Sequence, residues 1–172
     1  FRDYDEHLMF EAYNEVDNTY KSRLCTPIAA AQMNELNQLF VDVVRSTGGN
    51  NEKRILQIQT FLSSWSITAV ESFEAPTDMY PDKLIAQVHI YPSFWDEKFE
   101  ETLDLFDKFT ERTGLPIVVG EFSITAKTYP TVYKYTLVSN FIARAKAHNV
   151  VVYYWDNNSD RHFRVSRLEI FK

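Results

Sequence analysis

The chain has 172 residues, of which 45% are hydrophobic and 15% aromatic, and its formal net charge is −6. This length suits one domain with a sizeable core, and the negative charge argues against nucleic acid as a partner. No run of 18 apolar residues occurs, so we expect no membrane partner. Cys25 is the single cysteine, which excludes an intrachain disulfide framework and a thiolate metal cluster.

Strands alternate with helices along the predicted chain. The first predicted strand covers residues 7–13 (HLMFEAY) and ends at the polar pair Asn14 and Glu15. A helix is predicted from Pro27, because Thr26 is a suitable N-cap and proline is favoured in the first turn. Its predicted inner stripe consists of Ile28, Leu36, Leu39, Phe40 and Val43.

The middle of the chain contains two further predicted strands, 55–61 (ILQIQTF) and 84–91 (LIAQVHIY). The stretch between them, 62–83, is predicted to hold one short helix and a long loop. A strongly amphipathic helix is then predicted at 97–112, with phenylalanines on one face and glutamates away from it.

The last predicted elements are strand 117–122 (IVVGEF), a helix from Pro130 and strand 150–155 (VVVYYW). Strands separated by helices imply parallel pairing through right-handed crossovers. Two α/β architectures fit this pattern: an open doubly wound sheet, or part of a (β/α)8 TIM barrel.

The position of the polar and aromatic residues favours the barrel. They follow or end at least four of the strands, and a barrel gathers its C-terminal strand ends into one ring, where barrel enzymes keep their sites. The residues concerned are Asn14, Glu15, His89, Tyr91, Glu121 and Trp155.

Two of these residues suit glycosidic bond cleavage, which needs two carboxyl groups facing each other across the sugar. Glu15 and Glu121 each follow or end an apolar strand. The alternative is that each is a structural acid paired with a buried arginine. Abundant aromatic residues on a mildly acidic chain also suit a neutral sugar ligand, which can stack on the rings.

Five motifs in order resemble glycoside hydrolase family 5, of the cellulase and endoglucanase type. HLMFEAYNE is similar to the strand that leads into Asn-Glu-Pro, with Val16 in place of the proline. LNQLFVDVVRSTGGNNEKRIL resembles the following helix and turn. LIAQVHIYPSFW matches the His-x-Tyr strand, IVVGEFS the nucleophile strand with Ser123 where glycine is frequent, and VVYYWDNN the last strand.

The resemblance implies a role for each matched residue. Glu15 would be the acid/base and Glu121 the nucleophile that forms a glycosyl-enzyme, with retention of configuration. Asn14 would hydrogen-bond the sugar 2-hydroxyl, Tyr91 would lie against the nucleophile, and His89 would steady the acid/base side.

Tryptophans complete the expected substrate cleft. By the resemblance, Trp155 would be the platform under the sugar at the cleavage point. Trp65 and Trp95 follow strands in the sequence. They could line the glycan cleft or pack in the core, and the sequence leaves both open.

The resemblance covers only part of a barrel, which needs about 250 residues when complete. The five predicted strands match strands four to eight, so residues 1–172 are predicted to be a partial catalytic domain. The arginine and histidine that the family places on earlier strands are absent. We expect the open sheet face to be apolar and to be covered by a missing N-terminal half-barrel or another copy of the chain.

The function that these expectations favour is a secreted, retaining endo-β-1,4-glucanase acting on a β-linked polysaccharide or oligosaccharide, without metal or cofactor. The first alternative is a non-catalytic glycan-binding or assembly fragment. The second is an open α/β binding protein unrelated to sugars.

Overall fold

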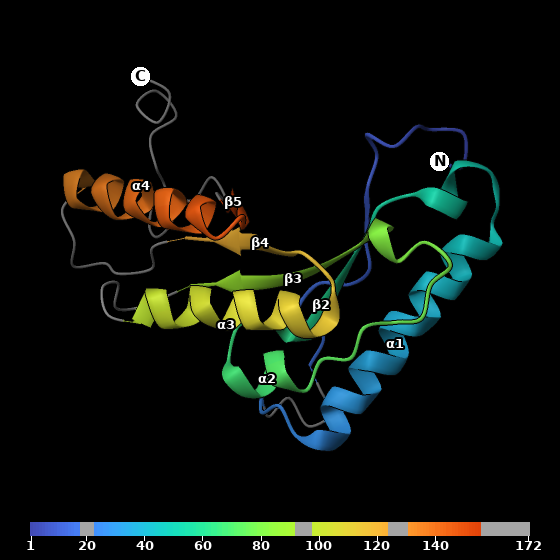
Figure 1. The fold of residues 1–172 in the computed structure, drawn as a ribbon, viewed down its shortest axis with the longest axis horizontal. Helices are drawn as coiled ribbons and strands as arrows, with labels where there is room; N and C mark the ends of the chain where they lie inside the picture. Colours follow the sequence, from blue (N-terminus) through green and yellow to red (C-terminus); the bar gives the residue numbers. More distant parts are fainter. Residues whose placement is uncertain (18–22, 92–97, 124–130, 156–172) are drawn as a thin grey trace.

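The computed structural model describes residues 1–17, 23–91, 98–123 and 131–155 (Figure 1). Its five strands form one parallel sheet in chain order. They are β1 (Phe10–Glu11), β2 (Leu56–Ser64), β3 (Leu84–Ile90), β4 (Ile117–Phe122) and β5 (Val151–Tyr154). A doubly wound sheet would reverse its strand order at a switch point. The sequential order therefore selects the barrel over the open sheet.

Four α-helices connect the strands: α1 (Pro27–Ser46), α2 (Ile67–Glu71), α3 (Lys98–Thr113) and α4 (Thr131–Ala147). Short 3-10 turns lie at Gly49–Lys53 and Pro81–Lys83. Buried side chains of all four helices join one core with alternate strand residues, so the helices cover the same sheet face. One helix layer on a sequential parallel sheet is the wall of a (β/α)8 barrel, as predicted. Among the described residues, no helix is both long and apolar enough to span a bilayer.

Most predicted elements are present, with shifted ends. Strand β4 begins and ends at the predicted residues, whereas β1 pairs over two residues instead of the predicted 7–13. Helix α1 begins after Thr26, whose hydroxyl oxygen accepts a hydrogen bond from the Ala29 amide at 3.2 Å. The predicted short helix between β2 and β3 is α2.

The predicted inner stripe of α1 was partly wrong. Ile28, Leu39 and Val43 are 73%, 55% and 54% exposed. Residues one or two positions further along the helix are buried instead. The helix carries two neighbouring apolar stripes, and the one with the smaller side chains packs against the sheet. The buried residues of α1 are Ala29, Ala30, Met33, Asn37, Val41 and Val44.

The sheet face opposite the helices is mixed, which corrects the expectation of an apolar face. Polar side chains of β2 and β3 share this face with Val151 and Tyr153 of β5, which are 54% and 46% exposed. Leu56 and Ile58 of β2 point into the helix-covered core, so the alternating glutamines Gln57 and Gln59 lie on the other face. There the side-chain amide of Gln87 donates a hydrogen bond to Glu11 at 2.6 Å. The buried apolar residues of β2 and β3 pack on the helix side, while Gln59 and Gln87 between them form part of a hydrogen-bonded layer on the other face.

A buried arginine attaches the N-terminal segment to the sheet. Arg54, 1% exposed, stacks over the Phe10 ring at 4.8 Å and bonds Asn51 Oδ1 at 2.7 Å. Its two terminal nitrogens donate to the backbone carbonyls of Phe1, Tyr4, Asp5 and Leu8. These bonds set where the chain enters β1, and therefore where the segment after β1 lies.

Candidate active site

The C-terminal strand ends bring together the acidic and aromatic residues that the sequence singled out. Glu15 lies in the bend after β1, His89 near the end of β3 and Glu121 near the end of β4. Tyr91 directly follows β3, and Trp155 directly follows β5. Residues that are up to 140 positions apart in the sequence (15 to 155) thus share one rim of the sheet.

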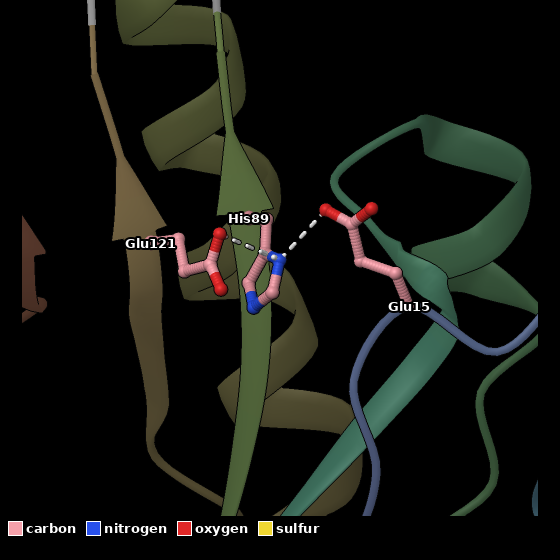
Figure 2. A group of neighbouring side chains, drawn as sticks. All are labelled: Glu15, His89 and Glu121. Atoms are coloured by element: carbon pink, nitrogen blue, oxygen red, sulfur yellow. Dashed lines mark hydrogen bonds and ion pairs between the residues drawn. The ribbon is translucent and has the colours of Figure 1, made fainter. Parts of the chain in front are cut away.

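The His89 imidazole lies between two carboxylates (Figure 2). Its Nδ1 is 2.9 Å from Glu15 Oε1 and 3.6 Å from Glu121 Oε2. The histidine side chain is 3% exposed, while the two glutamate side chains are 31% and 23% exposed. One oxygen of each carboxylate and the imidazole nitrogen all lie within 4.8 Å of one another. The glutamates therefore converge on a space that remains open to solvent.

A β-bulge aims Glu121 into this space. Val88 pairs with Val119, but the next pair is His89 with Glu121, so Gly120 is the extra residue. A Cβ at Gly120 would lie only 3.1 Å from the Gln87 side-chain carbon Cδ, and closer still to its Oε1. Glycine therefore lets the strand bulge against the inner polar layer while Glu121 stands beside His89.

Tyr91 and Trp155 are the aromatic residues of the site. The Tyr91 hydroxyl donates a hydrogen bond to Glu121 Oε2. Burial, and then the hydrogen bond to Glu121, raise the pKa of Tyr91, so it stays a donor at neutral pH. The Tyr91 ring meets the Trp155 ring edge to face, with centroids 6.0 Å apart and planes at 89°.

The backbone of Glu15 has an uncommon conformation, with φ of 46°. Its amide donates to Gln59 Oε1 at 3.2 Å. The Gln59 backbone is bonded in turn by the Asn37 side chain, with Nδ2 donating to the carbonyl at 2.9 Å. Sequence reasoning did not select Gln59 or Asn37. The available signal was an amide side chain within an apolar strand and another within the buried stripe of α1.

Three further site residues were predicted from the sequence: Asn14, Trp65 and Trp95. Asn14 is exposed beside Glu15. Trp65, directly after β2, is half-buried and packs against the main core. Trp95 lies outside the described residues. Of the two roles left open for Trp65, the observed contacts are those of core packing.

Within the described part of the chain, two groups of side chains have the composition and spacing to bind a cation. One is the Glu15, His89 and Glu121 cluster, and the other is an exposed surface group at Asp104, Asp107 and His148. In the first group the His89 imidazole already forms a hydrogen bond of 2.9 Å with the Glu15 carboxyl group.

Comparison with known proteins gives one consistent family. The family model described as "Cellulase (glycosyl hydrolase family 5)" matches residues 1–161. Endoglucanase 1 of Ruminococcus albus is 31% identical over 91% of this chain and 42% of its own length.

Two solved structures extend the comparison. A broad-specificity endoglucanase from Ruminococcus champanellensis with bound cellotriose is 31% identical, with a TM-score of 0.78 over 93% of this chain and 52% of its own. A mutant of a family 5 enzyme from Prevotella bryantii B14, in complex with a xyloglucan tetradecasaccharide, is 29% identical, with a TM-score of 0.79. That match covers 92% of this chain and 52% of the enzyme. The chain thus spans about half the length of the proteins it matches.

Proposed function

The chain belongs to glycosyl hydrolase family 5, the cellulase family, and we propose that it is the part of a retaining endo-β-1,4-glucanase that carries both reacting carboxyl groups. The observation that carries this proposal is the convergence of Glu15 and Glu121. An oxygen of each lies within 4.8 Å of the other, with His89 between them. Retaining glycosidases hold their two carboxyl groups about 5–5.5 Å apart, whereas inverting enzymes need about 6.5–9.5 Å to admit a water.

In the first step, a carboxylate oxygen of Glu121 attacks the anomeric carbon and the glycosidic C–O bond breaks. Glu15 gives its proton to the departing oxygen. Tyr91 orients the nucleophile, because its hydroxyl already donates to Glu121 Oε2. The products are a glycosyl ester on Glu121 and a shortened glycan with a free hydroxyl.

In the second step, Glu15, now a carboxylate, takes a proton from a water that attacks the same carbon. The ester bond breaks and Glu121 is released as a carboxylate. Two inversions restore the original configuration, and Glu15 is again protonated. His89 holds Glu15 through the 2.9 Å contact. Trp155 stands against Tyr91 as an apolar platform beside the reacting sugar.

The relatives and the open rim support the proposed substrate class. The similar structures were solved with cellotriose, a β-1,4-linked glucose trimer, and with a xyloglucan oligosaccharide, which has a β-1,4-linked glucose backbone. We propose a β-1,4-glucan backbone as the substrate here. Such polymers cannot cross a membrane, so we also propose that the enzyme acts outside the cell, which activity in culture medium rather than cell extract would support.

A complete barrel requires more strands than the described part of the chain provides. The closed fold has eight strands and the described part of the chain has five, so three further βα units are needed (8 − 5). Exposed apolar residues at both edges, Leu39 and Val43 on α1 and Val151 and Tyr153 on β5, offer contact surfaces. We propose that an N-terminal half-barrel covers them; a second copy of the chain is the competing occupant, and light scattering distinguishes the two.

Covalent trapping tests the proposal directly. A fluorinated cellobioside with a dinitrophenolate leaving group should inactivate the protein and leave a glycosyl ester on the peptide that contains Glu121. The Glu121→Gln variant should not be labelled, and both it and Glu15→Gln should lose about 10²–10⁴-fold or more in turnover. Proton NMR of early products should show retained configuration.

The trapping result separates this proposal from the non-catalytic alternative. Labelling at Glu121 with retained configuration supports the enzyme. Cellotriose binding without labelling or turnover, in a preparation that contains a complete barrel, would instead favour a glycan-binding fragment. Labelling at another carboxylate would show that the nucleophile is misassigned.

A further inference from the structure

A buried amide on the sheet holds the backbone of Glu15. Glu15 has φ of 46°, a left-handed conformation that is unfavourable for a residue with a side chain. Such a conformation persists where neighbouring groups stabilise it. Here the contact comes from β2: Gln59 Oε1 accepts the Glu15 amide at 3.2 Å.

Gln59 is itself held on two sides. Strand β1 leaves the sheet after Glu11, with a last bond from the Ala12 amide to the Gln57 carbonyl at 2.9 Å. Two residues further along β2, at Gln59, the side chain of Asn37 from α1 makes the backbone hydrogen bonds that a neighbouring strand would make. That side chain donates to the Gln59 carbonyl at 2.9 Å and accepts from the Gln59 amide at 3.4 Å. Gln59 and Asn37 are both fully buried.

The acceptor end of the Gln59 side chain is the end with partners. Oε1 accepts from the Glu15 amide and from the Ser63 hydroxyl, whereas Nε2 is buried with no hydrogen-bond partner among the described residues. Leaving a buried donor unpaired is unfavourable, because the donor loses its hydrogen bond to water and gains none in the protein. An apolar residue of the same shape would remove that unfavourable contribution. The structural role of the Gln59 amide therefore lies in its oxygen, which accepts the two hydrogen bonds.

The two contacts act on different parts of Glu15. His89 contacts the carboxylate at 2.9 Å, and Gln59 contacts the backbone amide at 3.2 Å. Without Gln59, the segment after β1 could relax from its left-handed conformation, and the carboxyl would leave the line between His89 and the departing oxygen. We propose that Gln59, anchored by Asn37, is a positioning residue for the acid/base Glu15, an inference that rests on the function proposed above.

The test is a near-isosteric substitution with a matched control. Gln59→Met keeps length and volume, deletes the acceptor and also deletes the unpaired donor, so the fold should tolerate it. Gln57→Met makes the same change two residues earlier, on the same strand and the same sheet face, at the position that pairs with Glu11. Both variants are made in an active preparation of the protein, together with Glu15→Gln.

The main readout is leaving-group dependence, because a reduced amount of folded protein cannot produce it. With methylphenyl β-cellobioside, whose departure needs a proton, Gln59→Met should lower kcat/KM by about 10²-fold, as expected for an acid displaced by about 1 Å. With dinitrophenyl β-cellobioside, which departs without one, it should change kcat/KM less than about threefold. Gln57→Met should match the wild type on both substrates.

A second readout does not need activity. Amide hydrogen exchange at Glu15 should be protected in the wild type and in Gln57→Met, and should become faster in Gln59→Met. Equal losses on both substrates, or no loss with unchanged exchange, would overturn the positioning role.

Failure of the underlying function looks different from failure of the positioning role. If Glu15→Gln itself shows no leaving-group dependence, then Glu15 is not the acid and the role of Gln59 falls with it. If Glu15→Gln is selective and Gln59→Met is not, only the positioning inference is wrong.

Discussion

Gly120 is the position where one added methyl group should disturb both stability and the site. Its Cβ would lie 3.1 Å from Gln87 Cδ and closer to Oε1, below the separation of ordinary contacts. The Gln87 side chain is buried and donates to Glu11 at 2.6 Å, so it cannot rotate away without losing that bond. Gly120→Ala therefore combines steric overlap with a lost hydrogen bond.

The expected magnitude follows from those two parts. Overpacking costs about 1–3 kcal/mol and the lost bond to a carboxylate about 1.5 kcal/mol, so together we expect about 3 kcal/mol. With a slope of about 2 kcal/mol per molar urea, the unfolding midpoint should fall by about 1.5 M. Because Gly120 is the bulge residue beside Glu121, turnover on an aryl cellobioside should also fall about tenfold or more.

Two further variants show whether the overlap is the cause. Gln87→Ala in the Gly120→Ala background removes the overlapping side chain, so the two losses should be less than additive by at least about 1 kcal/mol. Gly114→Ala is the control, because no atom lies within 4 Å of its Cβ although its φ is +73°. It should cost about 1 kcal/mol of backbone strain and leave turnover unchanged. A Gly120→Ala protein with wild-type midpoint and turnover would refute the reasoning, and so would a penalty that Gln87→Ala does not relieve.

Three other substitutions test separate contacts. Arg54→Met should lower the free energy of unfolding by about 3–5 kcal/mol in urea titration, because it removes the donors to four backbone carbonyls of the N-terminal segment. A loss below about 1 kcal/mol would contradict this. The hydrogen bond to Asp107 raises the pKa of His148, so the pair stabilises the fold below about pH 6.5 and that stability is lost as pH rises through the raised value. His148→Gln should therefore destabilise by about 0.5 kcal/mol at pH 5.5 and by less at pH 8.5, and an equal effect at both would count against it. Tyr91→Phe should lower turnover about 10–100-fold without unfolding the protein, because it removes a donor to Glu121; unchanged kinetics would remove Tyr91 from the mechanism.

Local signals were enough for most of the secondary structure. Gly114 and Pro116 precede an apolar run, and β4 begins and ends where that run predicts. Thr26 followed by proline predicted the start of α1, and its hydroxyl does cap that helix. Such signals act within a few residues of the chain, so they can be read without knowing what packs against them.

Signals that depend on a partner surface were ambiguous or invisible. Both stripes of α1 are apolar, and only contact with the sheet decides that Met33 is buried while Ile28 is exposed. The pairing of β1 was overestimated because the chain turns away after Glu11, where Asn37 takes over the bonding of β2. Buried amides such as Gln59 resemble surface residues in the sequence.

What the sequence determined by itself is the alternation of elements, and with it the α/β class and the set of polar residues at the strand ends. The tertiary structure decided which of those residues meet. Parallel strands in chain order place the ends of β3 and β4 side by side, and the extra residue at Gly120 turns Glu121 toward His89. The left-handed turn at Glu15 brings the other carboxylate to the same imidazole. These outcomes depend on register, on bulges and on contacts between distant segments, and one-dimensional periodicity carries no information about them.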